Sequence, residues 1–167
     1  PWPPDAVLMI RKADVADAGD VGDIWNWMIR ETLATFTSDE KSTSQIEALI
    51  AARPDSFFVA EDHGQIIGFI TFGPFRSGSG YAATVEHSVI VGSAHTSRGV
   101  GSRLMTTAMD TASRQGHHVM IGAISAVNPQ AVKFHEKMGF ECAGRLPEVG
   151  RKNGQWLDLI LMQKMLS

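Results

Sequence analysis

The sequence predicts an α/β fold in which helices cover both faces of a central sheet. Segments with the patterns of strands alternate with segments of helical periodicity along the chain. Residues 84–124 also run strand, helix, strand, and a crossover of this kind joins two parallel strands. The length of 167 residues predicts one domain over 1–167, with 1–6 as an irregular N-terminal segment.

The first part of the chain predicts two helices and three strands. A strand over residues 7–11 precedes Asp14, a preferred helix-capping residue, so a helix is expected from there through Arg30. A second helix over Thr43–Ala52 ends before Pro54, which restricts the residue in front of it. The other two elements are hairpin strands, expected over 56–61 and 65–72.

Residues 73–80 are rich in glycine and predict a loop, after which residues 81–91 form an extended strand. The following helix is expected over 99–115 and ends at Gly116. Apolar residues recur along it at helical spacing, which predicts a buried stripe. That stripe consists of Leu104, Met105, Ala108, Met109 and Ala112.

The C-terminal part predicts a strand over 118–124 and a helix over 129–138. Proline at the first turn of that helix and Gly139 after its last turn are typical boundary residues. Two strands, over 141–150 and 156–165, complete the sheet.

A turn suited to a diphosphate follows the strand that ends at Val91. The first N–H groups of a helix lack intrahelical partners and lie at the positive end of its dipole, so they bind anions. Glycine leaves space for phosphates there, while arginine and serine add charge and a hydroxyl. The residues concerned are Arg98, Gly99, Val100, Gly101, Ser102 and Arg103.

The spacing of this turn excludes two common nucleotide motifs. A P-loop requires a lysine after its second glycine, and a dinucleotide fingerprint requires glycine at the position of Leu104. A ligand other than a nucleoside triphosphate or NAD should therefore be considered, and coenzyme A also carries a diphosphate.

Composition narrows the possible partners and surroundings. The formal net charge of -3, without a concentrated basic face, argues against nucleic acid. No apolar run approaches the roughly 18 residues of a membrane span, so no membrane partner is expected. The lone Cys142 fits a reducing cytoplasm and is expected to be a small buried residue rather than a nucleophile. His117 and His118 point oppositely along a strand, so no metal is expected.

A second motif makes the chain resemble a known family. Asn128, Ala131, Phe134, His135 and the pair Gly139-Phe140 resemble the N-x-x-A-x-x-L-Y-x-x-x-G-F signature of the GNAT acetyltransferases. The resemblance extends over essentially the whole chain and implies acetyl-CoA as acyl donor. It also implies a GNAT-like sheet, mixed but mostly antiparallel, with a parallel pair splayed at the acyl-CoA site.

Within that family, residues 84–91 and 149–158 resemble the phosphinothricin, methionine sulfone and methionine sulfoximine N-acetyltransferases. This resemblance implies a small amino-acid-like amine as substrate and a homodimer. Thr96 and Ser97 depart from the family's Q/R-x-x-G-x-G/A loop, which should weaken coenzyme A binding without abolishing it. Tyr81 is followed by alanines where some relatives place a second arginine.

Glu86 is the candidate general base. Period-two alternation places it on one face with Thr84, Ser88 and Ile90, beside the expected cofactor turn, and partial burial would raise its pKa. The alternative is a solvated carboxylate or one paired with an arginine. His87 lies on the opposite face and is expected to be structural.

His135 stands at the family's tyrosine position and is the candidate proton donor for the departing thiolate. A packed histidine that contacts coenzyme A without transferring a proton is the alternative. Asn128 is expected to bind the pantetheine, to cap its helix, or both.

The remaining site residues are expected to hold the reacting groups. A backbone N–H of Val89, Ile90 or Val91 would stabilise the oxyanion. Arg76 matches a family position that grips a carboxylate, although a solvated loop arginine is the alternative. Phe36 and Tyr81 would form walls for the substrate side chain.

These assignments predict direct acetyl transfer from acetyl-CoA to the amine of a small amino acid or its sulfone, sulfoximine or phosphinate analogue. Two alternatives stay open. The acceptor could be a protein N-terminus, a polyamine or an antibiotic, or the protein could be a non-catalytic acyl-CoA sensor.

Overall fold

The computed structural model describes residues 8–96 and 98–167; residues 1–7 and Ser97, including the expected irregular segment 1–6, lie outside the described residues. The described strands form one sheet in the order β1-β2-β3-β4-β5-β7-β6. Their bounds are β1 (Leu8–Lys12), β2 (Phe57–Asp62), β3 (Gln65–Pro74), β4 (Thr84–Val91), β5 (Val119–Ser125), β6 (Glu141–Lys152) and β7 (Gln155–Met165).

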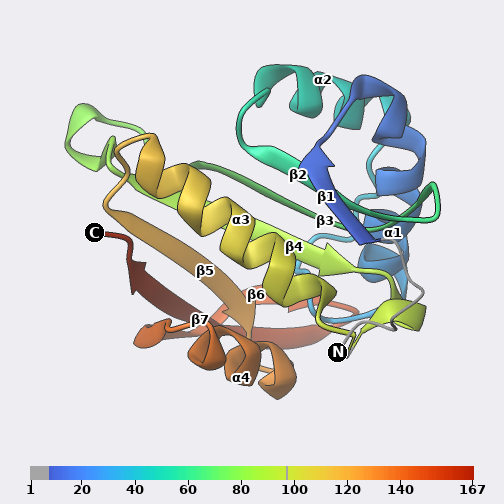
Figure 1. Cartoon of the computed structure of the whole chain (residues 1–167). Coiled ribbons are helices and arrows are strands. Elements are labelled where there is room, and N and C mark those ends of the chain that lie inside the picture. Colours follow the sequence, from blue (N-terminus) through green and yellow to red (C-terminus); the bar gives the residue numbers. More distant parts are fainter. Residues whose placement is uncertain (1–7, 97) are drawn as a thin grey trace.

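Helices cover both faces of this sheet, as predicted (Figure 1). The α-helices are α1 (Ala18–Glu31), α2 (Thr43–Ala52), α3 (Val100–Arg114) and α4 (Pro129–Lys137). The first two pack on one face and α3 with α4 on the other. Short 3-10 turns precede α1, β4 and α3.

Hydrogen-bonding side chains set the helix starts. Ser42 forms a capping box with Gln45 at the start of α2, and the Asn128 side chain accepts from the Ala131 N–H at the start of α4. Asp14 caps a 3-10 turn instead, so α1 begins at Ala18, four residues after Asp14. The carboxylate of Asp17 closes that turn by accepting from the Asp14 N–H while it pairs with Arg11.

β4 and β5 form the parallel pair, and all other neighbouring strands are antiparallel. Their register runs from Thr84–Val119 to His87–Gly122 and stops there. Beyond it β4 continues to Val91 and β5 to Ser125, and the two strands diverge toward their ends in Figure 1. The splayed pair implied by the family resemblance is therefore present.

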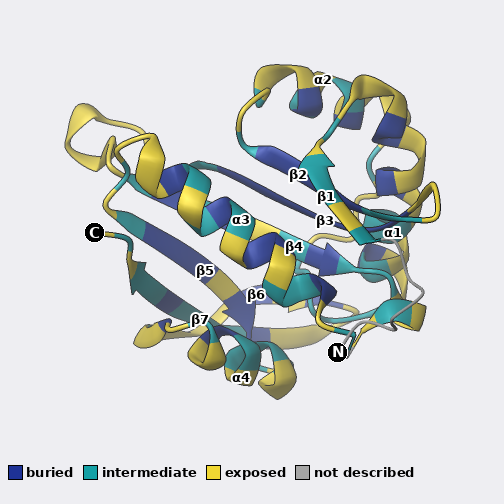
Figure 2. Ribbon diagram, viewed as in Figure 1, coloured by how far each residue is buried: buried dark blue, intermediate teal, exposed yellow. Residues whose placement is uncertain are grey.

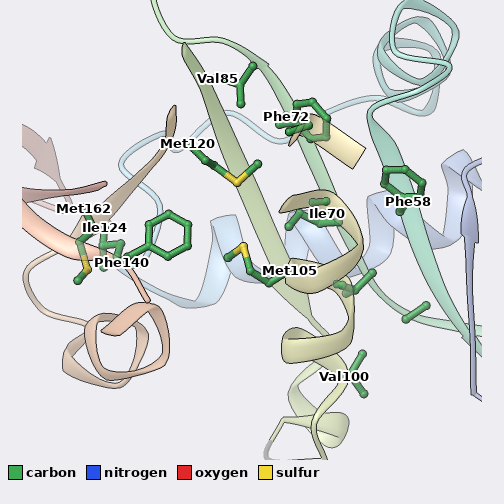
Figure 3. Close-up of a cluster of buried hydrophobic side chains, with 14 of the residues drawn as sticks. Phe58, Ile70, Phe72, Val85, Val100, Met105, Met120, Ile124, Phe140 and Met162 are labelled. Atoms are coloured by element: carbon green, nitrogen blue, oxygen red, sulfur yellow. The ribbon is translucent and has the colours of Figure 1, made fainter. Parts of the chain in front are cut away.

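The main core lies between α3 and the sheet. Met105 of α3 and Met120 of β5 are fully buried there, together with Phe72 and Phe140 (Figure 3). The predicted stripe on α3 is confirmed, because its residues are buried or packed against this core, and the helix turns its opposite face to solvent (Figure 2). A second core packs α1 and α2 on the other face.

The expectation for Cys142 is wrong: its thiol is free and the residue is exposed. The strand pattern around it is real, but β6 is the last strand of the sheet and most of its residues lie at the surface. A strand at the edge of a sheet buries few of its side chains, so apolar character alone did not indicate burial there.

Candidate active site

A cavity of about 310 Å³ opens where β4 and β5 separate. Its walls come from the ends of both strands, from α1, from residues 34–36, from α4 and from β7. Of the predicted site residues, the structure brings together Phe36, Glu86, Val89, Ile90, Asn128 and His135 around it. The cavity thus lies at the carboxyl ends of the parallel strands, where α/β sheets bind ligands.

The two faces of β4 supply different groups to this cavity. Ile90 packs with the α1 and α2 core, whereas Val85 and Val89 pack with the α3 core. By alternation Glu86 lies on the α1 side and His87 on the α3 side, as the sequence predicted. Burial raises the pKa of the Glu86 carboxyl above its ordinary value.

His87 and His135 form a buried pair whose Nε2 atoms lie 3.0 Å apart. The Nδ1 atom of His135 lies 2.7 Å from the Ala131 carbonyl oxygen, so it must carry a proton and donate. In the neutral ring Nε2 then accepts, and the donor is His87 Nε2–H. The remaining nitrogen, His87 Nδ1, is buried without a hydrogen-bond partner among the described residues.

Both histidines are neutral at physiological pH. Burial, together with the proximity of His135, lowers the pKa of His87 to about 3, and burial also lowers the pKa of His135. In this arrangement the neutral pair has no N–H left for a ligand, because His135 Nδ1–H and His87 Nε2–H are both donated within the protein. The geometry therefore supports a packing role for His135 over direct proton donation.

Asn128 and Ser125 line the cavity at the end of β5. The Asn128 side-chain oxygen accepts from the Ala131 N–H at 3.2 Å, which confirms the predicted cap. Ser125 is only 2% exposed, and its hydroxyl has no partner among the described residues. Serine is too common in strands for sequence alone to have indicated this position.

The predicted diphosphate turn leads into α3 as expected. Gly99 is the residue before the helix and has a φ of 80°, a left-handed conformation that glycine adopts without strain. No described side chain caps the first turn of α3, and the Arg103 N–H is bonded back to Gly99. The N–H groups of Val100, Gly101 and Ser102 therefore have no acceptor among the described residues and lie at the positive end of the helix.

Two details of this turn were not foreseen from the sequence. A Cβ on Gly101 would lie 3.4 Å from the ring of Phe134, so this glycine faces α4. Arg98 directs Nη1 toward His95 Nδ1 at 2.7 Å and Nη2 toward Asp62 at 3.8 Å, whereas Arg103 reaches the Leu8 carbonyl. Both guanidinium groups thus have protein contacts beside the turn.

Phe36 is held against the cavity by an interaction that the sequence did not reveal. Lys152 is 4% exposed, and its ammonium donates to the carbonyls of Ile29, Thr32 and Thr35 at 2.8–2.9 Å. It thereby joins the C-terminal end of α1 to residues 32–35, directly before Phe36. A lysine two residues before the glycine of a hairpin turn is usually solvated, so no local signal indicated its burial.

Arg76 and Tyr81 lie away from the cavity lining. The Arg76 guanidinium stacks over the Tyr81 ring at 5.4 Å, and Tyr81 is exposed. The described residues contain no cluster of three or more metal-ligating side chains. No helix in the described ranges is long and apolar enough to cross a membrane.

Comparison with known proteins decides the family. The model of the acetyltransferase (GNAT) family matches residues 22–140, which include the strand pair, the α3 turn and the α4 motif. The chain belongs to the GNAT family. Its fold is a single GNAT domain, and the family resemblance inferred from the two motifs is confirmed.

Curated GNAT relatives match along nearly the whole chain. An L-methionine sulfoximine/L-methionine sulfone acetyltransferase of Salmonella typhimurium is 36% identical, over 95% of each chain. An L-amino acid N-acyltransferase of Escherichia coli is 34% identical, over 95% of this chain and 94% of that one. A phosphinothricin N-acetyltransferase of Streptomyces viridochromogenes is 31% identical, over 93% and 86%.

Solved GNAT structures also match closely. A Salmonella typhimurium protein solved with its cofactor acetyl-CoA superposes with a TM-score of 0.92 at 36% identity, covering 96% of this chain and 95% of that chain. A phosphinothricin acetyltransferase of Sinorhizobium meliloti in complex with acetyl-CoA gives a TM-score of 0.90 at 26% identity, covering 96% and 89%.

Proposed function

We propose that this GNAT protein transfers an acetyl group from acetyl-CoA to the α-amine of a small amino acid of the methionine sulfone, methionine sulfoximine or phosphinothricin type. The observation that carries the proposal is a half-buried Glu86 in the cavity between the separated ends of β4 and β5. The names of several relatives specify such amino acids.

The residues present fit acetyl-CoA. The uncapped start of α3 offers N–H groups for the diphosphate, and the split between β4 and β5 leaves strand edges free for an extended pantetheine. Asn128 lines the same passage, and a backbone N–H of Val89, Ile90 or Val91 is the donor proposed for the oxyanion. The bound donor supplies an acetyl thioester at the cavity.

Glu86 is assigned as the base that removes a proton from the substrate ammonium. Its raised pKa makes the carboxylate a better proton acceptor than an exposed glutamate. Phe36 forms the wall for the substrate side chain, together with Trp25 and Met28 of α1. Arg76 and Tyr81 remain proposed substrate contacts from the loop before β4.

A homodimer and a cytoplasmic location belong to the same proposal. The hairpin of β6 and β7 exposes Val149 (56%) and Trp156 (59%) at the sheet edge, which supports an interface there. The free Cys142 is compatible with a reducing compartment. The negative net charge supports a small-molecule acceptor over nucleic acid.

An acceptor panel tests the function. Purified protein with acetyl-CoA is assayed against L-methionine sulfone, phosphinothricin, a peptide with a free N-terminus, spermidine and an aminoglycoside, with product masses recorded. We expect N-acetylated methionine sulfone or phosphinothricin at the highest kcat/KM. Turnover confined to the peptide, polyamine or aminoglycoside would overturn the acceptor class, and binding of acetyl-CoA without any turnover would indicate a sensor.

A further inference from the structure

Arg53 places a cation without a carboxylate partner over the centre of the sheet. It follows α2 as its C-terminal capping residue and is only partly exposed. Within the described ranges, its one hydrogen bond to a side chain runs from Nη1 to the Thr71 hydroxyl, at 3.0 Å. Among the described residues Arg53 forms no ion pair, and the guanidinium stays charged at neutral pH. A partly buried charge without a partner is costly, so an anion beside it would be stabilised.

Two residues of β3 fix where this guanidinium lies. Thr71 is 2% exposed, and its hydroxyl donates to the Ser56 carbonyl at 3.0 Å, which leaves its oxygen lone pairs for Arg53. A Cβ on Gly73 would lie 2.7 Å from Arg53 Cζ. The guanidinium therefore occupies the space that a side chain at position 73 would fill.

Strand register places this space next to Glu86. Gly73 is the register partner of Glu86, and Thr71 is the partner of Ser88. Side chains of directly opposed residues in an antiparallel pair project from the same face, with Cβ atoms about 5 Å apart. Arg53 thus lies on the face of the sheet that carries Glu86, beside that residue's strand neighbour, although Arg53 itself does not line the cavity.

An α-amino acid carries its amine and its carboxylate on one carbon. If the substrate amine lies at Glu86, the carboxylate of the same amino acid must lie close beside it. A guanidinium binds a carboxylate through two parallel hydrogen bonds. Arg76, on the exposed loop, instead stacks on Tyr81. Resting on the proposed function, we infer that Arg53 binds the α-carboxylate of the acyl acceptor and so selects amino acids over other amines.

The test compares two acceptors that differ only in this group: L-methionine sulfone and its primary carboxamide. Arg53→Gln should lower kcat/KM for the acid by about 10- to 100-fold, as expected for the loss of a charge-assisted pair, and change that for the amide by less than about threefold. The dissociation constant of acetyl-CoA should stay the same.

A second variant moves the guanidinium without removing it. Gly73→Ala puts a methyl group into its place, and the flexible arginine can swing aside. This variant should show the same acid-specific loss although its charge is unchanged. Arg114→Gln removes an exposed arginine from the last turn of α3 and should match the wild type on both acceptors.

The outcomes separate the inference from the proposed function. Equal losses on acid and amide, or no loss in either Arg53→Gln or Gly73→Ala, would overturn the role of Arg53 while wild-type turnover of methionine sulfone keeps the function. An acid-specific loss in Arg76→Gln alone would assign the carboxylate to the loop instead. A wild type inactive on the acid would overturn both.

Discussion

His87 of β4 and His135 of α4 face each other with Nε2 atoms 3.0 Å apart, and each ring is buried. The Ala131 carbonyl fixes the tautomer of His135, which in turn makes His87 the donor within the pair. One hydrogen bond therefore ties α4 to the strand that carries Glu86. It cannot persist once both rings are protonated, because neither Nε2 atom can then accept.

This pair predicts a loss of stability in acid. Unfolded His87 takes up a proton near its ordinary pKa of 6.5, whereas the folded protein resists protonation of that ring until about pH 3. The unfolded state therefore binds more protons as pH falls through this window, and folding stability should decrease by up to about 1.4 kcal/mol per pH unit for each such histidine. Urea unfolding between pH 7.5 and 5 measures the slope.

His87→Gln should reduce that slope, because one titrating group is gone. His118→Gln, which alters an exposed histidine bonded to the Ser167 hydroxyl, should keep the wild-type slope. Parallel slopes in the wild type and His87→Gln would contradict the assignment of the acid response to this pair.

The turn before α3 predicts that alanine substitutions at two glycines differ in their effect on acetyl-CoA binding. Gly99 and Gly116 flank this helix with φ angles of 80° and 90°, and a Cβ added at either would meet no atom of the described residues within 4 Å. Alanine at either position should cost about 1–2 kcal/mol from the left-handed backbone. Only Gly99→Ala should also weaken acetyl-CoA binding, by about tenfold, because it disturbs the N–H groups of the first turn.

Isothermal titration calorimetry measures the acetyl-CoA affinity of both variants, and Gly116→Ala serves as the control for backbone strain. Equal affinities in both variants would show that the start of α3 does not hold the diphosphate.

Lys152 predicts a link between stability and acceptor binding. Lys152→Met leaves the carbonyls of Ile29, Thr32 and Thr35 without their donor, which should cost about 2–4 kcal/mol and loosen the segment that carries Phe36. KM for the acceptor should rise several-fold while the acetyl-CoA dissociation constant stays constant. Lys12→Met, which breaks an exposed ion pair with Asp55, should cost less than about 1 kcal/mol.

Denaturant unfolding and steady-state kinetics on the two variants give both quantities. A Lys152→Met protein with unchanged KM for the acceptor would show that the segment before Phe36 keeps its position without the ammonium.

Much of this architecture is predictable because it depends on local chemistry. The alternation in β4 assigns Glu86 and His87 to opposite faces, and Asn128 followed by proline marks the start of α4. Glycine at position 99 is required by a positive φ, which a strand-to-helix turn makes foreseeable. These signals lie within a few residues of the features they predict.

The missed residues depend on contacts between distant parts of the chain. Lys152 meets Ile29 across 123 positions, and Arg53 reaches Thr71 over Gly73 only because β3 returns beneath α2. Cys142 was misjudged for the same reason, since the position of β6 at the edge of the sheet follows from its pairing with β7. Composition and periodicity do not contain these long-range neighbours.

The proposed acetyl transfer depends most on Glu86, the base that receives the proton of the attacking amine. The most direct measurement is kcat of Glu86→Gln with acetyl-CoA and L-methionine sulfone, taken together with the acetyl-CoA dissociation constant of the same preparation. We predict that kcat falls by about 10²- to 10⁴-fold, the range for loss of a general base, while acetyl-CoA binding changes by less than about twofold. A Glu86→Gln enzyme that acetylates methionine sulfone at the wild-type rate would contradict this assignment.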